Sequence, residues 1–504
     1  MNVKTIVQGF GAAIVVLILR VWPLLSRYHP VIYHSFLPMQ SVVWGVLIDL
    51  AGVSLLAALL FAWLEKSETG LRTAIWAFVA AELGSGLVVA AIAAHRAPIA
   101  LLTPNAAYLL TLLSAIGLRW WRPLWYRQAV HGFGVLLALG GCSMVWMIPQ
   151  LLYQGLRTQR ADTAVPVSYP VALPAAFKGG GAAGKRIVWL LFDELSYDQT
   201  FEHRYPGLDM PAFDNFRRQS VVFTDLQPAG YYTDRVIPSF FLGARVDNIR
   251  SNLDGDPIVN LTGHPWRPFD AQATVFADAQ RLGWTTGIVG WYNPYCRILA
   301  GTLNYCYWRM GDGQSDGALP DQSVFKNAAA PLIERILALQ GKPGSTVQKH
   351  IQDLAVLMPQ AEALLRDESI EFVFIHLPVP HPPGIYRRPG HHGAGGSYID
   401  NLALADNTLA ELLSTVRATA LAAQTTIIVC SDHSWRVPLW RSTSWTKEDE
   451  AASHGRFDPR PVLMIHLPDQ QTEQDVTTPF EEIRLHDILE HLLRGEGAGL
   501  AAKP

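Results

Sequence analysis

The chain has 504 residues, enough for two or three domains, and only 16% of them are Asp, Glu, Lys or Arg. A typical soluble protein carries about 25% charged residues, so the deficit indicates a membrane-embedded portion. The first 150 residues contain 9 Lys or Arg and 4 Asp or Glu, against 31 and 39 in the rest of the chain. The second part is therefore mildly acidic, which gives no support for nucleic-acid binding.

Five apolar stretches in the first part have about the 20 residues that a bilayer requires. We place them at residues 7–25, 39–63, 73–94, 101–118 and 129–152. A cleaved signal peptide is the alternative for the first stretch, but no small-residue cleavage site follows it and four more stretches do. Lys and Arg favour the N-terminus and the loops after the second and fourth stretches, so we expect the remainder of the chain outside the cytoplasm.

Two acidic residues, Asp49 and Glu82, fall within the second and third stretches. Intramembrane acids are costly, and both a hydrogen-bonding role between helices and a role in handling substrate remain open for them. The segment 153–184 follows the last stretch. Its run from Ala175 to Gly184 is mostly Ala and Gly, which predicts a flexible or extended linker.

Short apolar runs alternate with helical patterns from residue 185 to residue 504. This alternation predicts an α/β domain with a mainly parallel sheet, preceded by a helical membrane bundle over residues 1–152 and the linker over 153–184. Strands are expected at 186–192, 220–224, 285–290, 371–376, 426–430 and 461–466. Helices are expected at about 210–218, 236–243, 270–282, 346–366, 400–422 and 480–493.

Two of these strands end on acidic residues. The first strand is followed by Asp193 and Glu194, and the strand over 426–430 is followed, after one serine, by Asp432 and His433. Apolar runs without alternation suit central parallel strands, whose ligand-binding ends lie at one edge of the sheet. Three carboxylates and an imidazole at that edge predict a site for one divalent cation. The alternative for either acid of the first pair is a carboxylate at the N-terminus of the next helix.

The cysteines carry a further expectation. Cys296 and Cys306 flank a loop of the outer domain, where a disulfide can form, and the alternative is two free thiols. Cys142 and Cys430 are expected in the core of their apolar segments. No Cys/His spacing typical of a zinc site is present.

The segment that runs from Tyr231 to Gly243 is Tyr-Tyr-Thr-Asp-Arg-Val-Ile-Pro-Ser-Phe-Phe-Leu-Gly. It resembles the nucleophile segment of the alkaline phosphatase and sulfatase superfamily, in which the nucleophile stands ten residues before the glycine that ends a short helix. That spacing falls on Thr233. Sulfatases carry a cysteine or serine there for conversion to formylglycine, whereas threonine is similar to membrane-anchored lipoteichoic acid synthases and phosphoethanolamine transferases.

Chemistry supports the same residue. A threonine hydroxyl is a poor nucleophile, but a divalent metal acidifies a bound hydroxyl as it does a bound water. A helix that starts at about residue 236 would add backbone N–H groups for the transferred anion. Taken alone, Thr233 would be interpreted as an N-cap or loop hydroxyl; together with the strand-end acids it is predicted to be the nucleophile.

The resemblance extends to the metal ligands. The segment Ser-Asp-His-Ser that contains Asp432 and His433 is similar to the family's Ser-Asp-His-Gly, which implies that both residues bind metal. The segment Phe-Asp-Glu-Leu around Asp193 and Glu194 resembles the strand-end acid motif. It implies that one of these two acids binds the metal directly, beside Thr233, and it leaves open which.

Several histidines and arginines complete the expected site. His381, in a His-Pro-Pro segment, matches the histidine that contacts the phosphate or sulfate in the family. His454, followed by glycine, is similar to a late histidine that binds the phosphate or protonates the leaving group, and a loop histidine is the alternative. Arg235 and Arg436 are candidate anion binders by position only, and surface arginines are the alternative. His376 is expected to be a core histidine.

The resemblance implies one divalent ion (Mn, Mg, Ca or Zn) and an enzyme anchored in a bacterial inner or plasma membrane. We expect it to move a phosphoethanolamine or phosphoglycerol head group from a phospholipid to an envelope glycan or lipid, through a Thr233-linked intermediate. One alternative is a membrane-bound phosphoester or sulfate-ester hydrolase. A second alternative, from another class, is a non-catalytic membrane sensor or assembly factor.

Overall fold

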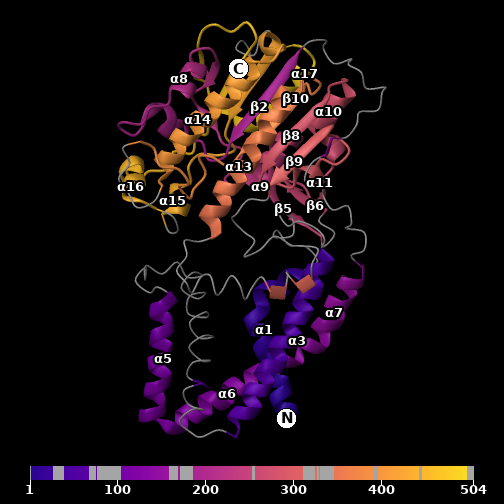
Figure 1. Cartoon of the computed structure of the whole chain (residues 1–504), viewed down its shortest axis with the longest axis vertical. Coiled ribbons are helices and arrows are strands. Elements are labelled where there is room, and N and C mark those ends of the chain that lie inside the picture. The colour runs from indigo at the N-terminus through magenta and orange to yellow at the C-terminus, as the bar shows by residue number, and fades with distance from the viewer. Residues whose placement is uncertain are drawn as a thin grey trace. The chain divides into compact units, whose positions relative to one another are not determined.

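The structure is a computed structural model of the chain (Figure 1). It describes residues 2–25, 39–66, 75–76, 104–157, 169–170, 185–252, 256–309, 324–325, 328–329, 345–389, 396–441 and 445–496. The chain divides into two compact units, one formed mainly by residues before 160 and the other mainly by residues after it.

The first unit is helical. Its helices are α1 (Val3–Leu25), α3 (Met39–Leu64), α5 (Pro104–Trp121), α6 (Pro123–Cys142) and α7 (Met144–Arg157). Glycines let α1 approach α6 closely: a Cβ on Gly11 would lie 1.8 Å from the carbonyl oxygen of Leu137. The amide of Gln8 also donates to the carbonyl of Gly134 at 3.0 Å. Small residues and buried amides are the means by which helices associate where lipid removes the hydrophobic driving force.

Two helical segments of the described residues are long and apolar enough to cross a membrane. They are Gln40–Leu64 and Pro123–Leu156, with mean hydropathies of 2.3 and 1.8, and Val3–Ile18 is a shorter apolar helix. The expected stretch at 73–94 lies outside the described residues apart from 75–76, as do Glu82 and most of the expected linker. The five-span bundle therefore stays a prediction, and Asp49 lies within α3.

The second unit is built on a mixed sheet in which nine strands are described. In sheet order they are β1 (Tyr169–Pro170), β9 (Tyr305–Arg309), β8 (Thr286–Trp291), β10 (Phe372–Leu377), β2 (Arg186–Phe192), β11 (Thr425–Cys430), β12 (Leu463–His466), β3 (Val221–Phe223) and β13 (Gln474–Val476). The strands from β9 to β11 are mutually parallel, while β1 and β12 run antiparallel to their neighbours. The predicted α/β domain is confirmed, with antiparallel pairs near both edges.

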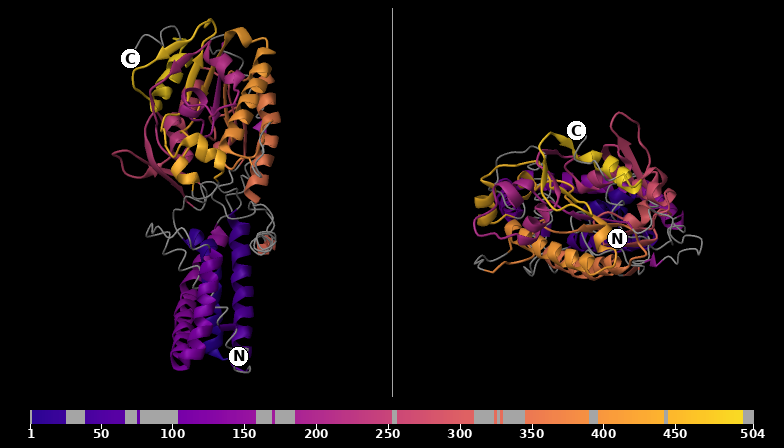
Figure 2. Two further views of the ribbon diagram at one scale, coloured as in Figure 1. Left: turned by 90° about the vertical axis from the view of Figure 1, so that its left-hand side faces the viewer. Right: turned by 90° about the horizontal axis from the view of Figure 1, so that it is seen from above.

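Helices cover both faces of this sheet (Figures 1 and 2). One face packs against α8 (Pro211–Arg217), α13 (Ser345–Arg366) and α14 (Tyr398–Arg417), and the other against α9 (Thr233–Leu242), α10 (Val275–Arg281) and α17 (Leu485–Leu493). Along β2, Val188 and Leu190 join one core and Trp189 and Leu191 join the other. Both faces are buried, which explains why the strand sequences show no polar alternation.

Smaller elements lie outside this sandwich. A three-stranded sheet consists of β5 (Val246–Ser251), β6 (Pro257–Leu261) and β7 (Arg267–Pro268), and β4 (Leu226–Gln227) pairs with β14 (Phe480–Glu481). The short helices are α11 (Tyr295–Ile298), α15 (Val437–Trp440) and α16 (Lys447–Ser453). These elements were not expected from the sequence pattern.

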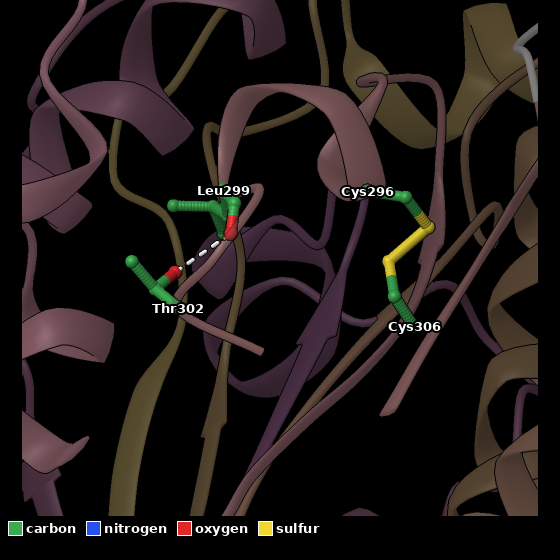
Figure 3. Close-up of a disulfide and its surroundings, with 4 residues drawn as sticks. All are labelled: Cys296, Leu299, Thr302 and Cys306. Carbon is green, nitrogen blue, oxygen red and sulfur yellow. Dashed lines mark hydrogen bonds between the residues drawn. A yellow bond between two sulfur atoms is a disulfide. The ribbon is translucent and has the colours of Figure 1, made fainter. Parts of the chain in front are cut away.

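A disulfide joins Cys296 of α11 to Cys306 of β9, with the two Sγ atoms 2.07 Å apart (Figure 3). Between them the chain turns back, and the hydroxyl of Thr302 donates to the carbonyl of Leu299 at 2.8 Å. Cys430 is buried in β11 as expected, whereas Cys142 is exposed on α6, so its interpretation as a core residue is wrong for the described helices.

Arg186, the first residue of β2, is fully buried and holds the end of α13. Its guanidinium donates to the carbonyls of Leu364, Leu365, Asp367 and Ile370 at 2.7–3.1 Å. The last carbonyls of a helix have no partner within the helix, so this side chain satisfies groups that would otherwise be buried unpaired. Burial lowers the pKa of Arg186, against the attraction of Asp367 and Glu368.

We predict that Arg186→Met destabilises the sheet unit by about 3 kcal/mol or more, because several buried carbonyls lose their donors. For a unit of this size the midpoint of thermal unfolding would fall by roughly 6 °C or more, measured by near-ultraviolet circular dichroism. Arg218→Met is the matched control, because Arg218 is exposed and surface substitutions change stability by about 0.5 kcal/mol or less. Equal midpoints in the two variants would contradict this account of Arg186.

Candidate active site

Three neighbouring strands bring the predicted residues to one edge of the sheet. Phe192, the last residue of β2, pairs with Leu377 at the end of β10, and Leu191 pairs with Cys430 at the end of β11. Asp193 follows Phe192 directly, Asp432 follows Cys430 after one serine, and both acids are fully buried. The carboxyl edge of a parallel sheet is where ligands bind in α/β folds.

A tight turn after β2 aims the first acid pair in two directions. Glu194 adopts a left-handed conformation with φ of 66°, which is uncommon for a residue with a side chain. Its N–H donates to Oδ1 of Asp432 at 3.2 Å, and its carbonyl accepts the hydroxyl of Tyr398 at 2.7 Å. These two bonds hold the turn, so the side chains of Asp193 and Glu194 reach different partners.

Nε2 of His433 and three oxygen atoms near it form a group of four atoms that can bind metal. Oδ2 of Asp432 lies 3.0 Å from this nitrogen, Oγ1 of Thr233 lies 3.1 Å from it, and Oδ1 of Asp193 lies 4.0 Å from it. Ligand atoms about 2.1 Å from a tetrahedral ion are themselves roughly 3.4 Å apart. The spacings therefore fit one shared divalent ion.

The electrostatics of these carboxylates also fit a cation. Oδ1 of Asp193 is buried and has no hydrogen-bond partner among the described residues. Burial, and then the adjacent carboxylate of Asp432, raise the pKa of Asp193 well above its usual value. Burial also acts to raise the pKa of Asp432, but the charge and hydrogen bond of His433 outweigh it and lower that pKa. A divalent ion would stabilise both carboxylates in their ionised form.

Glu194 is held differently from Asp193. Its carboxylate accepts hydrogen bonds from the guanidinium of Arg436 and from the indole N–H of Trp440, the latter at 2.8 Å. One of its oxygens also lies within 4.8 Å of the ligand atoms of Asp193 and His433, so distance alone does not exclude it from a metal site. We favour Asp193 as the direct ligand, because the charge of Glu194 is already neutralised by a buried cation.

Thr233 is the first residue of α9 and is 4% exposed. The helix starts three residues earlier than expected, so the threonine itself belongs to the first turn, in which the N–H groups of Arg235 and Val236 bond to the carbonyl of Tyr232. Its hydroxyl also lies 3.4 Å from Oδ2 of Asp193. Asn293, which the sequence patterns did not indicate, is fully buried and donates from Nδ2 to the carbonyl of Thr233 at 3.5 Å.

His381 and Arg436 lie together beside this cluster. Nη2 of Arg436 is 3.3 Å from Nε2 of His381, and both side chains are more than nine-tenths buried. Burial first, and then the charge of Arg436, lower the pKa of His381 well below its usual value. The imidazole is therefore neutral, with Nε2 as acceptor and Nδ1 as donor. Arg436 is not a surface arginine, since it is paired with Glu194.

His376 is buried, as expected for a core histidine, but it also touches the cluster. Its Nε2 lies 3.2 Å from Oδ2 of Asp193, and its Nδ1 lies 2.6 Å from the hydroxyl of Tyr295. Burial lowers the pKa of His376 to about 4, with Asp432 acting in the opposite direction. The sequence offered no signal for Tyr295, which lies 81 residues from His376.

Two predicted residues lie further out. Arg235 is partly exposed, its guanidinium stacks over the ring of Tyr232 at 4.8 Å, and its Nε is 3.9 Å from Asp234. His454 is exposed at the C-terminal end of α16, in a left-handed conformation with φ of 48°. The structure does not bring its side chain into the hydrogen bonds described around Thr233, so its catalytic role stays a prediction.

No protein-family model and no curated protein matches the chain. Solved structures match it. The chain is similar to members of the alkaline phosphatase and sulfatase superfamily.

The matching structures include a sulfatase, a phosphonate monoester hydrolase and a lipoteichoic acid synthase. The PsFucS1 sulfatase from Pseudoalteromonas sp. is 14% identical, with 64% of this chain and 69% of that chain covered and a TM-score of 0.42. The phosphonate monoester hydrolase of Agrobacterium radiobacter is 13% identical, with 62% of this chain and 73% of that chain covered and a TM-score of 0.38. The lipoteichoic acid synthase LtaP from Listeria monocytogenes is 12% identical, with 63% of this chain and 73% of that chain covered and a TM-score of 0.36.

We predict that Asp193→Asn weakens the binding of Mn²⁺ or Zn²⁺ to the full chain by more than about 100-fold, because it removes a charged direct ligand. Glu194→Gln should cost less, about 10–100-fold at most, as expected for a residue that acts through its neighbours. Competition with a metal chelator on detergent-solubilised protein measures both constants. A larger loss in Glu194→Gln than in Asp193→Asn would reverse the assignment of the two acids.

Proposed function

We propose that the chain is a metal-dependent, membrane-anchored phosphotransferase that uses Thr233 as its nucleophile. The observation that carries this proposal is the place of the Thr233 hydroxyl, 3.1 Å from His433 and 3.4 Å from Asp193 at the start of a helix. A hydroxyl at a helix N-terminus among buried metal-type ligands suits attack on an anionic ester.

The residues proposed to hold the ion are Asp193, Thr233, Asp432 and His433, with Glu194 paired to Arg436 beside them. A bound divalent ion would acidify the Thr233 hydroxyl, so that its proton is lost to water, and would offset the charge of the transferred group. Oγ1 of Thr233 then forms a bond to phosphorus while the bond from phosphorus to the leaving oxygen breaks. In the second step an acceptor hydroxyl attacks the phosphothreonine, the bond from phosphorus to Oγ1 breaks, and the acceptor's proton passes to the released oxygen of Thr233.

Other side chains are proposed to bind the anion and move protons. His381 offers an N–H donor, and the α9 N-terminus offers backbone N–H groups, to the non-bridging oxygens. His454 is proposed to protonate the leaving oxygen. Its loop lies near the nucleophile segment, since the ring of Phe457 is 6.0 Å from that of Tyr231. Arg235 is proposed to attract the anion from the partly exposed side of the same segment.

A phospholipid is the donor we propose, with a phosphoethanolamine or phosphoglycerol head group as the transferred part. The two helical segments long enough to cross a membrane support a membrane anchor for the chain, and an anchored enzyme would have lipid donors at hand. The acceptor would be a hydroxyl of an envelope glycan or lipid. Threonine cannot be converted to formylglycine, so the chemistry of Thr233 favours phosphate over sulfate esters.

Two alternatives share the fold and separate in experiment. A phosphoester hydrolase would use water as the acceptor and release the head group phosphate into solution. A non-catalytic sensor or assembly factor would form no covalent intermediate, and full chain purified without bound divalent ion would favour it.

We predict that full chain in vesicles with head-group-labelled phosphatidylethanolamine or phosphatidylglycerol acquires label on Thr233, detected by mass spectrometry of peptides. Thr233→Ala should abolish the label and lower turnover by about 10³-fold or more, as loss of a nucleophile does. Thr302→Ala is the matched control, because that hydroxyl is also buried and, among the described residues, bonds to the carbonyl of Leu299 in its own turn.

Full turnover in Thr233→Ala would contradict the nucleophile assignment. Chelator treatment should abolish labelling of the unchanged chain, and labelling that survives complete metal removal would contradict the metal requirement. Label that appears in solution rather than on an acceptor would identify the hydrolase alternative.

A further inference from the structure

Two buried side chains that belong to none of the sequence motifs reach Asp193 from inside the core. Nε2 of His376 lies 3.2 Å from Oδ2 of Asp193, and the hydroxyl of Tyr295 lies 2.6 Å from Nδ1 of His376. All three side chains are fully buried. The chain of contacts therefore runs from α11 through β10 to the carboxyl end of β2.

The hydrogen bonds from Tyr295 through His376 to Asp193 all run in one direction. A carboxylate that binds a divalent ion is ionised and can only accept, so Nε2 of His376 would carry the proton and donate a hydrogen bond to Asp193. A neutral imidazole has one proton, which leaves Nδ1 as an acceptor for the hydroxyl of Tyr295. The contacts with Asp193 and Tyr295 favour this tautomer, and the backbone of Trp291 is a further hydrogen-bond partner of the imidazole.

Several contacts hold Tyr295 in the position from which its hydroxyl reaches His376. The disulfide at Cys296, the next residue, ties α11 to β9 (Figure 3). The ring packs edge-on against Phe374, with centroids 5.7 Å apart, and lies over Gly290, where a Cβ would be 2.2 Å from the ring. A side chain at position 290 would displace the ring, so the glycine makes room for Tyr295.

The effect falls on the orientation of Asp193. Its Oδ2 accepts a hydrogen bond from Nε2 of His376 and lies 3.4 Å from the hydroxyl of Thr233, while its Oδ1 has no hydrogen-bond partner among the described residues. A hydrogen bond to one carboxylate oxygen restricts rotation about the Cβ–Cγ bond. The other oxygen is then presented in one direction.

We infer that His376 and Tyr295 are positioning residues that orient Asp193 so that Oδ1 faces the metal and Oδ2 faces Thr233. This inference rests on the proposed function, since it requires a divalent ion at the cluster. Partners that orient a metal ligand typically change metal affinity by about 10–100-fold when they are removed. Neither residue is among the proposed ligands of the ion.

The test compares variants that remove single groups. Tyr295→Phe deletes one hydroxyl and keeps the ring, and Tyr305→Phe is its matched control, because Tyr305 bonds to Gln360 at 3.0 Å on the neighbouring β9. His376→Leu removes the donor to Asp193. His376→Gln retains an N–H donor near the position of Nε2 and serves as the conservative rescue.

The measurement is the dissociation constant of Mn²⁺ from the detergent-solubilised full chain, by chelator competition, together with the thermal midpoint. We expect a loss of affinity of about 10–100-fold in His376→Leu, a loss of about threefold to tenfold in Tyr295→Phe, recovery to within about threefold in His376→Gln, and no change in Tyr305→Phe. If His376→Leu fails to fold, Tyr295→Phe against Tyr305→Phe decides.

The outcomes separate the two levels of the proposal. If Tyr295→Phe, His376→Gln and His376→Leu all bind Mn²⁺ with the affinity of the wild-type chain, the positioning role is overturned and the metal site stays intact. A loss in His376→Gln equal to that in His376→Leu would overturn the role of the N–H donor. If the wild-type chain binds neither Mn²⁺ nor Zn²⁺, the proposed function is overturned, and the positioning role with it.

Discussion

Burial of three carboxylates at one edge of a parallel sheet is the constraint on which the site depends. Asp193, Glu194 and Asp432 are all fully buried, and an ionised carboxylate in such surroundings is costly unless it is paired. Arg436 neutralises one of them, Glu194. His433 faces Asp432, and Asp193 retains an oxygen without a partner among the described residues. The arrangement holds more negative charge than its own cations balance, and a divalent ion would remove that imbalance.

The fold produces this density of charge through the order of its strands. β2 lies between β10 and β11, and the three are parallel and end in register. Segments that are far apart in the sequence therefore deliver Asp193, His376 and Asp432 to one place. α9 adds Thr233 at its first turn, and the turn at Glu194 sends adjacent carboxylates to different partners. The chemistry follows from strand order more than from any single motif.

Much of this could be predicted from local sequence. Apolar runs without alternation indicated β2, β10 and β11, and their ends indicated Asp193, Asp432 and His433. The choice between Asp193 and Glu194 could not be made, because the partner of Glu194 is Arg436, 242 residues away. His376 looked like a core histidine, and it is buried, but its contact with Asp193 depends on strand neighbours. Tyr295 and Asn293 follow β8 without any spacing signal, so only the tertiary structure reveals them.

The most direct test of the account is anomalous X-ray diffraction at the manganese edge from crystals of the full chain grown with Mn²⁺. The account predicts one strong peak with side-chain atoms of Asp193, Thr233, Asp432 and His433 at about 2.0–2.3 Å, and with the carboxylate of Glu194 still on Arg436. A peak ligated by Glu194 in place of Asp193, or a cluster without any peak at saturating Mn²⁺, would contradict it.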